Sequence, residues 1–394
     1  MRDSFRRLIR GISRSFCNEM HVVFSDLGAI ITLFAPAIVY PILFSFAFSN
    51  EIVKDVEMAV VDQSHTGLSR QLVRMLDATD EVKVTGKFTD LEEARHAYYD
   101  NQVKGIVIIP KGFEKEVLSG QQTHVSLFAD AAYLMNYKQM VSGCLYASQT
   151  LGAGVKIRKL MAKGLPQSAA MNLVRPLRLN SFQLYNPTGG YGVYIVALLV
   201  VAVLQQILLM VISLVNGTSN EYKRYQAVRM DGLHGASEWI ILLGRAAFYL
   251  LSCLILTVFC VGLLPKWFSF PMLASLSDLT LFFLPFILAS TFLSMAVSEF
   301  FKTRELGILI FSFMALPFLF LSAIPWPPEA MPGFLKYISL LVPSTEAFKG
   351  YMKLALADAS FGQVLGHWNH LWGLSLVFFA GAVFSMKRRR SAVR

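Results

Sequence analysis

Long apolar stretches separated by polar segments dominate the chain. A bilayer-spanning helix needs about 20 predominantly apolar residues, and six stretches reach or approach that length. They cover residues 27–48, 191–215, 240–264, 279–300, 306–324 and 371–386, the last with an alternative start near residue 367. The pattern therefore predicts a polytopic α-helical membrane protein with six transmembrane helices.

Composition and charge agree with this interpretation. Hydrophobic residues make up 55% of the chain and charged residues only 16%, whereas soluble globular proteins are about 25% charged. These values exclude a disordered protein and argue against a purely soluble enzyme. The formal net charge is +10, but the basic residues flank the apolar stretches, so we expect a membrane protein with no nucleic-acid partner.

The distribution of Lys and Arg predicts the orientation of the helices. With the N-terminus in the cytoplasm, the inner segments hold fifteen basic residues, and the two shorter outer segments hold four, Lys266, Lys336, Lys349 and Lys353. Cytoplasmic loops carry the excess of positive charge in membrane proteins. We therefore expect both termini inside, including the basic tail 387–394, and residues 50–190 outside. The first apolar stretch is too long for a signal peptide and no small-residue cleavage site follows it, so residues 27–49 are expected to remain as the first span.

The segment 50–190 has the pattern of a globular domain. Strand-like stretches at 56–61, 81–88, 105–109 and 124–128 alternate with helical stretches, which include 68–76 and 134–163. Thr89 and Glu92 have the spacing of a capping box, which would open a further helix. The alternation predicts a small extracytoplasmic α/β domain with a mixed sheet, inserted between the first and second spans.

No motif indicates catalysis or a bound cofactor. The chain lacks the G-x-x-x-x-G-K-[ST] pattern of ATP-binding P-loops, and it lacks G-x-S-x-G, H-E-x-x-H and C-x-x-C. The candidate metal ligands of segment 50–190 do not have metal-site spacing, and we interpret them as turn and surface residues: Asp62, His65, His96, His124 and Asp130. We therefore expect no enzyme, and no catalytic, metal-binding or cofactor-binding residue.

Few polar residues fall inside the apolar stretches. Arg245 and Glu299 lie near span ends, where snorkelling or pairing at the membrane interface would satisfy them. Gln205 and Gln206 lie deep in the second span, where they either line a polar path or hydrogen-bond a neighbouring helix. Four prolines within spans permit either a bending gate or a fixed kink: Pro36, Pro41, Pro285 and Pro317.

Three further segments have their own patterns. Residues 1–26 include apolar positions at helical spacing with arginines between them, which is typical of an amphipathic helix against anionic lipid at the inner membrane surface. The polar cytoplasmic segment 216–239 either docks a soluble partner or is an ordinary solvated loop. Prolines divide residues 325–350 into pieces too short to cross a bilayer, which predicts short re-entrant helices in the outer leaflet.

Together these features resemble the type-2 ABC transporter permeases, in the exporter branch with a large external domain between the first and second spans. The residues that carry the resemblance are VVDQSHTGLSRQLVRML at 60–76, LEEA at 91–94, GIVIIPKGF at 105–113 and the outer segment 322–349. The resemblance covers nearly the whole chain.

The resemblance implies partners and a docking surface. Such permeases dimerise with an identical or related chain, and each half binds a separate ATPase subunit that uses ATP and Mg. The amphipathic helix and the loop after the second span contact that ATPase. The corresponding residues here are Glu221, Tyr222, Lys223, Arg224, Arg229, Asp231 and Glu238. In the family a Gly-Thr pair often follows an acidic residue in this loop, but no such pair follows Glu221 here. We therefore expect the ATPase to dock at the same place, and we assign no individual contacts to it.

The family also implies a substrate route at the dimer interface, between the first, second and fifth spans. The candidate lining residues here are Phe34, Tyr40, Gln205, Gln206, Phe313 and Phe320. An outer gate would form at the proline-rich re-entrant segment, at Pro325, Pro328, Pro332 and Pro343.

These implications lead to one main hypothesis and two alternatives. We expect the permease subunit of an ATP-driven ABC exporter that moves a drug, lipid or similar amphipathic substrate across the bacterial cytoplasmic (inner) membrane, with a periplasmic adaptor as a further partner. A membrane-anchored sensor or envelope assembly factor would instead use the external domain for binding, and would work without any ATPase. A membrane enzyme would need paired acids or a His-Asp set within the spans, which the sequence lacks.

Overall fold

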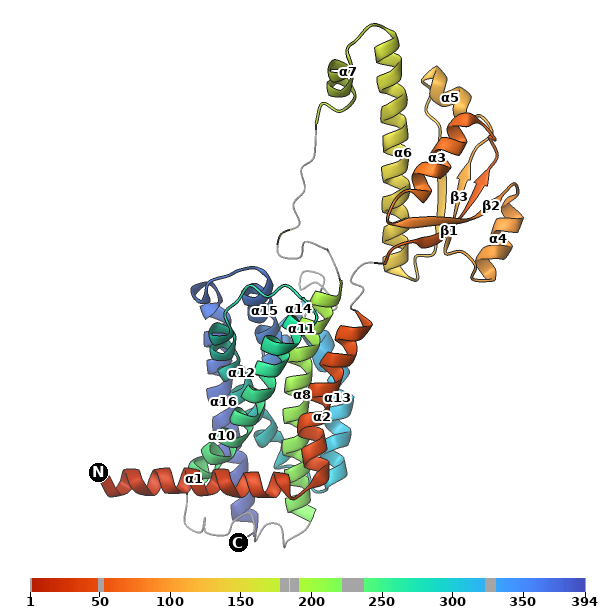
Figure 1. The fold of residues 1–394 in the computed structure, drawn as a ribbon. Helices are drawn as coiled ribbons and strands as arrows, with labels where there is room; N and C mark the ends of the chain where they lie inside the picture. The colour runs from red at the N-terminus through yellow and green to blue at the C-terminus, as the bar shows by residue number, and fades with distance from the viewer. Residues whose placement is uncertain are drawn as a thin grey trace. The chain divides into compact units, whose positions relative to one another are not determined.

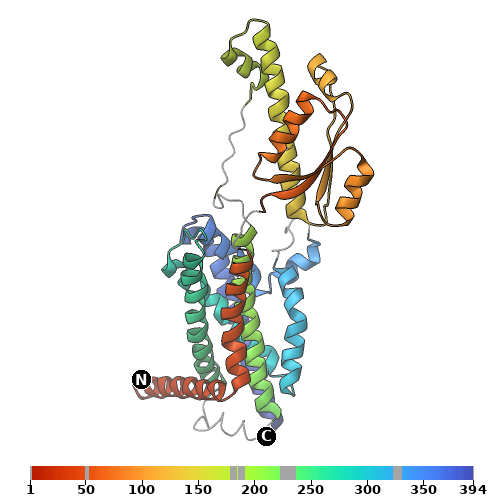
Figure 2. The same cartoon turned by 45° about the vertical axis from the view of Figure 1, so that its right-hand side comes forward.

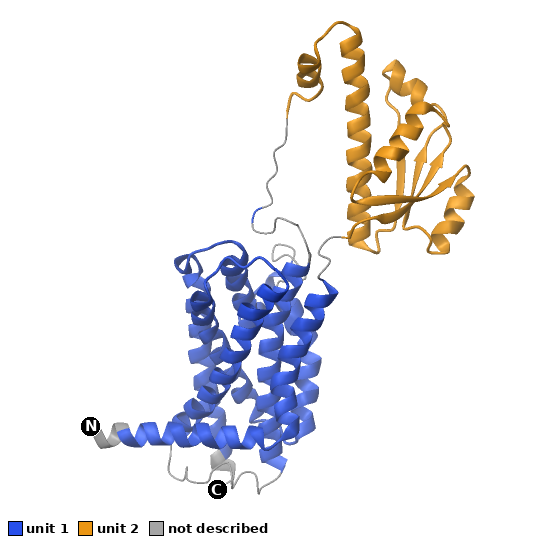
Figure 3. Ribbon diagram, in the orientation of Figure 1, with its two compact units in different colours: residues 1–51, 183–394 blue, residues 52–182 orange. Residues whose placement is uncertain are grey.

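The computed structural model describes residues 2–48, 53–177, 184, 191–221, 237–322 and 331–393. The chain forms two compact units, one made of residues 1–51 and 183–394 and the other of residues 52–182 (Figure 3). The second unit is therefore an insertion into the first, between the first and second apolar helices.

Six helical spans in the described part of the first unit are long and apolar enough to cross a membrane, as the sequence predicts. Helix α10 continues through a π-helical turn, η1, into the short α11, and these three form one span. The spans are α2 (Leu27–Ala47), α8 (Tyr191–Glu221), α10 (Glu238–Thr257) with η1 (Val258–Leu263) and α11 (Leu264–Trp267), α12 (Leu276–Ser298), α13 (Arg304–Leu321) and α16 (Phe361–Val393).

Two spans extend six residues or more beyond their predicted boundaries, because their polar residues have partners. Helix α8 continues past residue 215 to Glu221, and the hydroxyls of Thr218 and Ser219 donate to the carbonyls of Leu214 and Val215, each at 2.9 Å. Helix α16 begins at Phe361, ten residues before the main predicted start at 371. Polar residues near its start interrupt the apolar pattern but not the helix.

The amphipathic helix α1 (Arg2–Phe24) runs across one end of the bundle, roughly perpendicular to the spans (Figures 1 and 2). A short break separates it from α2. Asp26 caps α2 at this break, because its carboxylate accepts hydrogen bonds from the backbone N–H groups of Gly28 and Ala29. The start of α1 and the end of α16 lie at this same end of the bundle.

The spans differ in how deeply they are buried within the unit. Helix α8 is central, because 72% of the residues in its 18-residue apolar stretch are buried. The corresponding shares are only 22% for α2 and 11% for α13. Both of these helices pack on α8 (Figures 1 and 2). Helices α2 and α13 therefore present long apolar faces at the margin of the bundle.

Two short helices follow α13 at the end of the bundle opposite α1 (Figure 1): α14 (Gly333–Ser339) and α15 (Pro343–Leu356). Pro332 precedes α14, and Pro343 is the first residue of α15, where a missing N–H costs nothing. Pro325 and Pro328 lie outside the described residues. The assignment of a gate to these prolines stays a prediction.

The inserted unit contains a four-stranded mixed sheet in the order β2-β1-β3-β4. Strands β1, β2 and β3 are parallel, and β4 is antiparallel to β3. The strands are β1 (Val56–Asp62), β2 (Val82–Phe88), β3 (Gly105–Ile109) and β4 (Ser126–Ala129), and the helices are α3 (Gly67–Asp77), α4 (Leu91–Tyr99), α5 (Phe113–Ser119), α6 (Leu134–Ala162) and α7 (Gln167–Val174). Strands and helices alternate from β1 to α6 in the order that the sequence pattern predicts.

Both faces of the sheet are covered, as the alternation of side chains in β1 requires. Met58 and Val60 belong to a core with residues of α3, α5 and α6, and Ala59 and Val61 belong to a second core with residues of α4. The inserted unit therefore has a hydrophobic core of its own.

The helix starts in this unit correct one detail of the sequence prediction. The capping box lies at α3, where Thr66 and Ser69 exchange hydrogen bonds between side chain and backbone. Helix α4 is capped by Asp90, whose carboxylate accepts from the N–H of Leu91 at 2.8 Å. The predicted pairing of Thr89 with Glu92 is therefore wrong, because the helix begins one residue later than expected and Asp90 is its N-cap residue.

Candidate functional site

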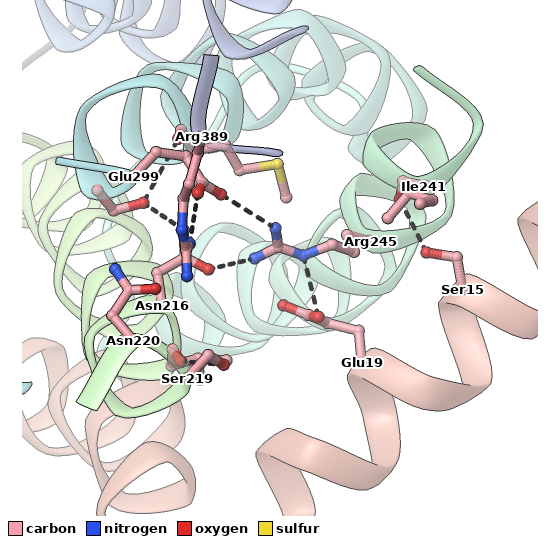
Figure 4. A network of polar contacts seen from close by, with 12 residues as sticks. Ser15, Glu19, Asn216, Ser219, Asn220, Ile241, Arg245, Glu299 and Arg389 are labelled. Atoms are coloured by element: carbon pink, nitrogen blue, oxygen red, sulfur yellow. Dashed lines mark hydrogen bonds and ion pairs between the residues drawn. The ribbon is translucent and has the colours of Figure 1, made fainter. Parts of the chain in front are cut away.

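Arg245 lies at the centre of a buried cluster of charges at the α1 end of the bundle (Figure 4). Its side chain is 2% exposed. The Nε atom lies 3.0 Å from Glu19 Oε2, Nη2 donates to Asn216 Oδ1 at 2.8 Å, and Nη1 lies 4.0 Å from Glu299 Oε1. The Nε–H is not aligned for a hydrogen bond, so its contact with Glu19 is an ion pair.

The two carboxylates each have a second partner. Glu19 Oε1 accepts from the hydroxyl of Tyr249 at 2.9 Å, and Glu299 Oε2 accepts from Arg389 Nη1 at 2.6 Å. The side chains of Glu19 and Glu299 are 1% and 6% exposed. Two acids therefore face two arginines. Three of these four side chains are buried away from water, and Arg389 is partly exposed.

These residues join helices that are far apart in the sequence. We call Glu19, Asn216, Arg245, Tyr249, Glu299 and Arg389 the Arg245 network. Its members come from α1, α8, α10, the end of α12 and α16. The network therefore fixes the amphipathic helix α1 to four of the membrane spans.

Helix α1 also packs closely against α10. The hydroxyl of Ser15 donates to the carbonyl of Ile241 at 2.8 Å. A Cβ atom at Gly244 would lie 2.5 Å from the carbonyl oxygen of Ile12, so only glycine permits this approach. The contact between α1 and α10 thus combines a close backbone approach with a buried ion pair.

A second ion pair lies at the starts of α2 and α13. Arg304 donates two hydrogen bonds to the Asp26 carboxylate, from Nη1 to Oδ2 at 2.7 Å and from Nη2 to Oδ1 at 3.0 Å. The backbone N–H of Arg304 donates to Glu221 Oε2 at 3.4 Å. A Cβ atom at Gly217 would lie 2.5 Å from the carbonyl oxygen of Thr303, so α8 and the start of α13 also meet closely.

The predicted docking residues flank these contacts. Glu221 ends α8 and reaches Arg304, and Glu238 begins α10. The remaining predicted residues lie outside the described part of the chain: Tyr222, Lys223, Arg224, Arg229 and Asp231. The polar segment 216–239 therefore begins and ends on helices that belong to the Arg245 network.

The predicted substrate-path residues do not share one environment. Gln205 is buried and its Oε1 accepts from the N–H of Ser344 at 2.8 Å, whereas Gln206 Nε2 donates to the carbonyl of Phe311 at 2.6 Å. Both glutamines thus hydrogen-bond neighbouring helices, the second of the two roles considered from the sequence. The aromatic ring of Phe34 stacks on Phe24, and the remaining aromatic candidates are exposed on the surface of the unit: Tyr40, Phe313 and Phe320.

A further polar cluster lies where α15 meets α16. Glu346 Oε1 accepts from Lys349 Nζ at 2.8 Å, and Glu346 Oε2 lies 2.6 Å from His367 Nδ1. Lys353 Nζ lies 3.0 Å from the other ring nitrogen of His367. Burial raises the pKa of the Glu346 carboxyl, but the hydrogen bonds and charges of His367 and Lys349 outweigh it and lower the pKa to about 2.

Sequence reasoning missed the Arg245 network. Arg245 and Glu299 are paired, but they do not snorkel to the membrane surface, because both side chains are buried among helices. One signal was present: Arg245 is the only basic residue within the six predicted apolar stretches. A lone arginine within a span needs an anionic partner, but the pattern could not show that this partner is Glu19 of the amphipathic helix.

Comparison with known proteins identifies one family. The sequence model of the ABC-2 family transporter proteins matches residues 28–384, which include all of α8 to α15, most of α2 and α16, and the whole inserted unit. A search of curated protein sequences finds no match to the chain.

Proposed function

The chain belongs to the ABC-2 family of transporter proteins, and we propose that it is the permease subunit of an ATP-driven exporter for a hydrophobic or amphipathic substrate such as a drug or lipid. The family and the six apolar helices together support a multi-pass membrane permease. The sequence holds no P-loop motif, so we assign the energy source to a separate ATPase subunit that uses ATP and Mg.

The Arg245 network is the observation that carries this proposal. An ATPase outside the membrane must move the spans through the parts of the permease that it touches. Helix α1 offers a surface for this contact, with the exposed arginines Arg6, Arg7, Arg10 and Arg14. Because Glu19 is paired within the bundle, a force on α1 acts directly on α8, α10, α12 and α16. We place ATPase docking at α1 and the segment 216–239.

The proposed orientation puts the α1 end in the cytoplasm. The excess of Lys and Arg at this end supports it. The chain leaves the bundle for the inserted unit after α2 and returns to it at α8, and a Cβ atom at Gly192 of α8 would lie 2.7 Å from the carbonyl oxygen of Phe48 after α2, at the end of the bundle opposite α1. The inserted unit would then be extracytoplasmic, and α14 and α15 would lie at the outer leaflet of a bacterial cytoplasmic membrane.

The marginal helices α2 and α13 suit contact with a second permease chain. Both are largely unburied within the unit, and both expose apolar residues such as Tyr40 and Phe313. Dimerisation through these helices would bury the faces and would place the substrate route between the two chains. A periplasmic adaptor is a further proposed partner, on the side of the inserted unit.

One experiment tests the docking proposal. The tagged full chain is purified from its own cells, and a copurifying ATPase is identified by mass spectrometry. Residues 222–236 are then replaced by a Gly-Ser linker, which keeps Glu221 with its contact to Arg304 and keeps Glu238 at the start of α10. We expect the permease to lose its stimulation of ATP hydrolysis, while thermal unfolding in lipid nanodiscs stays unchanged.

Two results would overturn the proposal. Normal stimulation by the linker variant would show that docking lies elsewhere. Uphill accumulation of substrate by the chain alone, in vesicles without any ATPase, would refute a separate energy source. If no ATPase copurifies and the chain still performs its role in the cell, the sensor or assembly-factor alternative is favoured.

A further inference from the structure

The inserted unit contains a cavity of about 590 Å³ between α5, α6 and the segment that leads to β4. Pockets for small-molecule ligands commonly measure about 300–1,000 Å³ and are mostly apolar. This cavity is lined chiefly by aliphatic and aromatic side chains from four elements, among them Leu72, Phe113, Val117, Leu127, Leu151 and Val155. Its size and lining fit the apolar part of a small ligand.

The charged residues that line the cavity are all basic. Lys156 and Lys159 belong to the lining, and no Asp or Glu does. Lys156 is exposed, so its ammonium group lies at the rim. Lys159 Nζ donates to the carbonyl of Val117 at 3.0 Å, which uses one of its three protons and leaves two for a ligand. The cavity therefore favours an anion over a cation at its polar end.

Two other lining residues do not contribute to the polar end. Thr123 lines the cavity, but its Oγ1 is buried and does not open onto the cavity space, so it is not available to a ligand. Cys144 also lines the cavity, but burial raises the pKa of its thiol to about 12. The thiol therefore stays neutral and serves as part of the apolar wall rather than as a nucleophile.

We propose that this cavity binds an anionic amphiphile with a single apolar tail. The tail would lie among the apolar residues between α3, α5 and α6. The carboxylate or phosphate head would meet Lys156 and Lys159 at the rim. The same site would hold the cargo of the exporter, a role that rests on the proposed function, whereas binding itself does not.

Two glycines of α6 provide a blocking variant and its matched control. Gly152 lines the cavity, and a Cβ atom there would meet no atom within 4 Å. The variant Gly152→Leu therefore adds a side chain at the cavity wall whose Cβ atom meets no neighbour, and it replaces glycine in a helix by a better helix former. Gly154 is equally free of neighbours but does not line the cavity. Gly154→Leu changes the same helix and leaves the site open.

The binding test uses the full chain in lipid nanodiscs and a photoreactive diazirine analogue of laurate. Cross-linked peptides are mapped by mass spectrometry. We expect labels in residues 113–127 and 141–159, displaced by laurate and not by dodecylammonium. Gly152→Leu should reduce this labelling by about tenfold or more, since the tail loses its buried volume, and Gly154→Leu should label like the wild type.

A charge variant tests the recognition of the head. Lys156→Gln should weaken displacement by laurate severalfold and leave displacement by neutral 1-dodecanol unchanged, and Lys138→Gln, an exposed position of α6 outside the cavity, is the control. Competition by lysophosphatidylglycerol against laurate distinguishes a phosphate head from a carboxylate head.

Three outcomes would overturn the binding site: labels confined to the membrane spans, labels in 113–159 that persist in Gly152→Leu, or equal displacement by the cationic analogue. No ATPase is present in this test, so its result is separate from the proposed function. Binding without a copurifying ATPase would remove the cargo role alone, and a copurifying ATPase without binding would remove the cavity proposal alone.

Discussion

Arg245 of α10 and Glu19 of α1 form an ion pair with Nε and Oε2 3.0 Å apart, and both side chains are almost completely buried. One partner comes from an amphipathic surface helix and the other from a membrane span. A buried ion pair is not by itself strong evidence of stability, because desolvation offsets much of the attraction. It does require that both charges be present, and it therefore specifies where α1 lies on the bundle.

Replacing Arg245 by Leu should destabilise the bundle strongly. The variant leaves the buried carboxylate of Glu19 without its arginine and Glu299 with only Arg389. Breaking a buried pair from one side costs about 3–5 kcal/mol. Denaturant unfolding of the chain in nanodiscs measures the loss, with Arg10→Leu at an exposed position of α1 as the control. Equal stability of the two variants would contradict a structural role for the network.

Gly217→Ala should push α8 away from the start of α13. The added methyl group would lie 2.5 Å from Thr303 O and 2.8 Å from Arg304 Cα, and both are backbone atoms that cannot rotate away. Overpacking of this kind costs about 1–3 kcal/mol. Gly366→Ala is the matched control in α16, since a Cβ atom there meets nothing within 4 Å. The unfolding midpoints of the two variants measure this cost. Equal midpoints would contradict the close approach of α8 to the start of α13.

Gln205→Leu should cost more stability than Gln206→Leu. Gln205 satisfies the N–H of Ser344 in the first turn of α15, and that N–H has no acceptor within its own helix. Leaving it buried and unpaired costs about 1–3 kcal/mol. The carbonyl of Phe311 lies inside α13, where the helix supplies another donor. The two unfolding free energies, measured side by side, should differ in this order, and the reverse order would argue against the assigned roles.

Glu346 should make stability depend on pH in the acid range. The pKa of its carboxyl in the folded protein is about 2, below its usual 4.5. A lowered pKa means that the carboxylate stabilises the fold fully above about pH 4.5 and loses that contribution as the pH falls toward 2. The groups that face it are Lys349 and His367, with Lys353 behind His367.

Unfolding at neutral pH and near pH 3.5 measures this effect against Glu346→Gln. The wild type should lose more stability than the variant on acidification, because the variant has no carboxylate to protonate. An identical pH dependence in the two proteins would show that the contacts of Glu346 with Lys349 and His367 do not lower its pKa.

Local patterns were sufficient for the elements but not for their long-range partners. The order of strands and helices from Val56 to Ala162 follows from alternation and turn residues, which are local signals. The apolar pattern predicts a main start at residue 371 for the last span, whereas α16 begins at Phe361. Hydropathy does not distinguish a polar residue that has a partner, such as His367, from one in solvent. The contacts of Arg245 depend on five segments meeting at one end of the bundle, which a single sequence does not show.

The Arg245 network also has a consequence for biosynthesis. Glu19 emerges from the ribosome long before Arg389, and the inserted unit and the intervening spans are translated between them. Domains generally fold in the order of synthesis, but this cluster of charges closes only after the last span has been inserted. A chain interrupted before α16 would leave Glu299 without Arg389, so the network is complete only once α16 is in place.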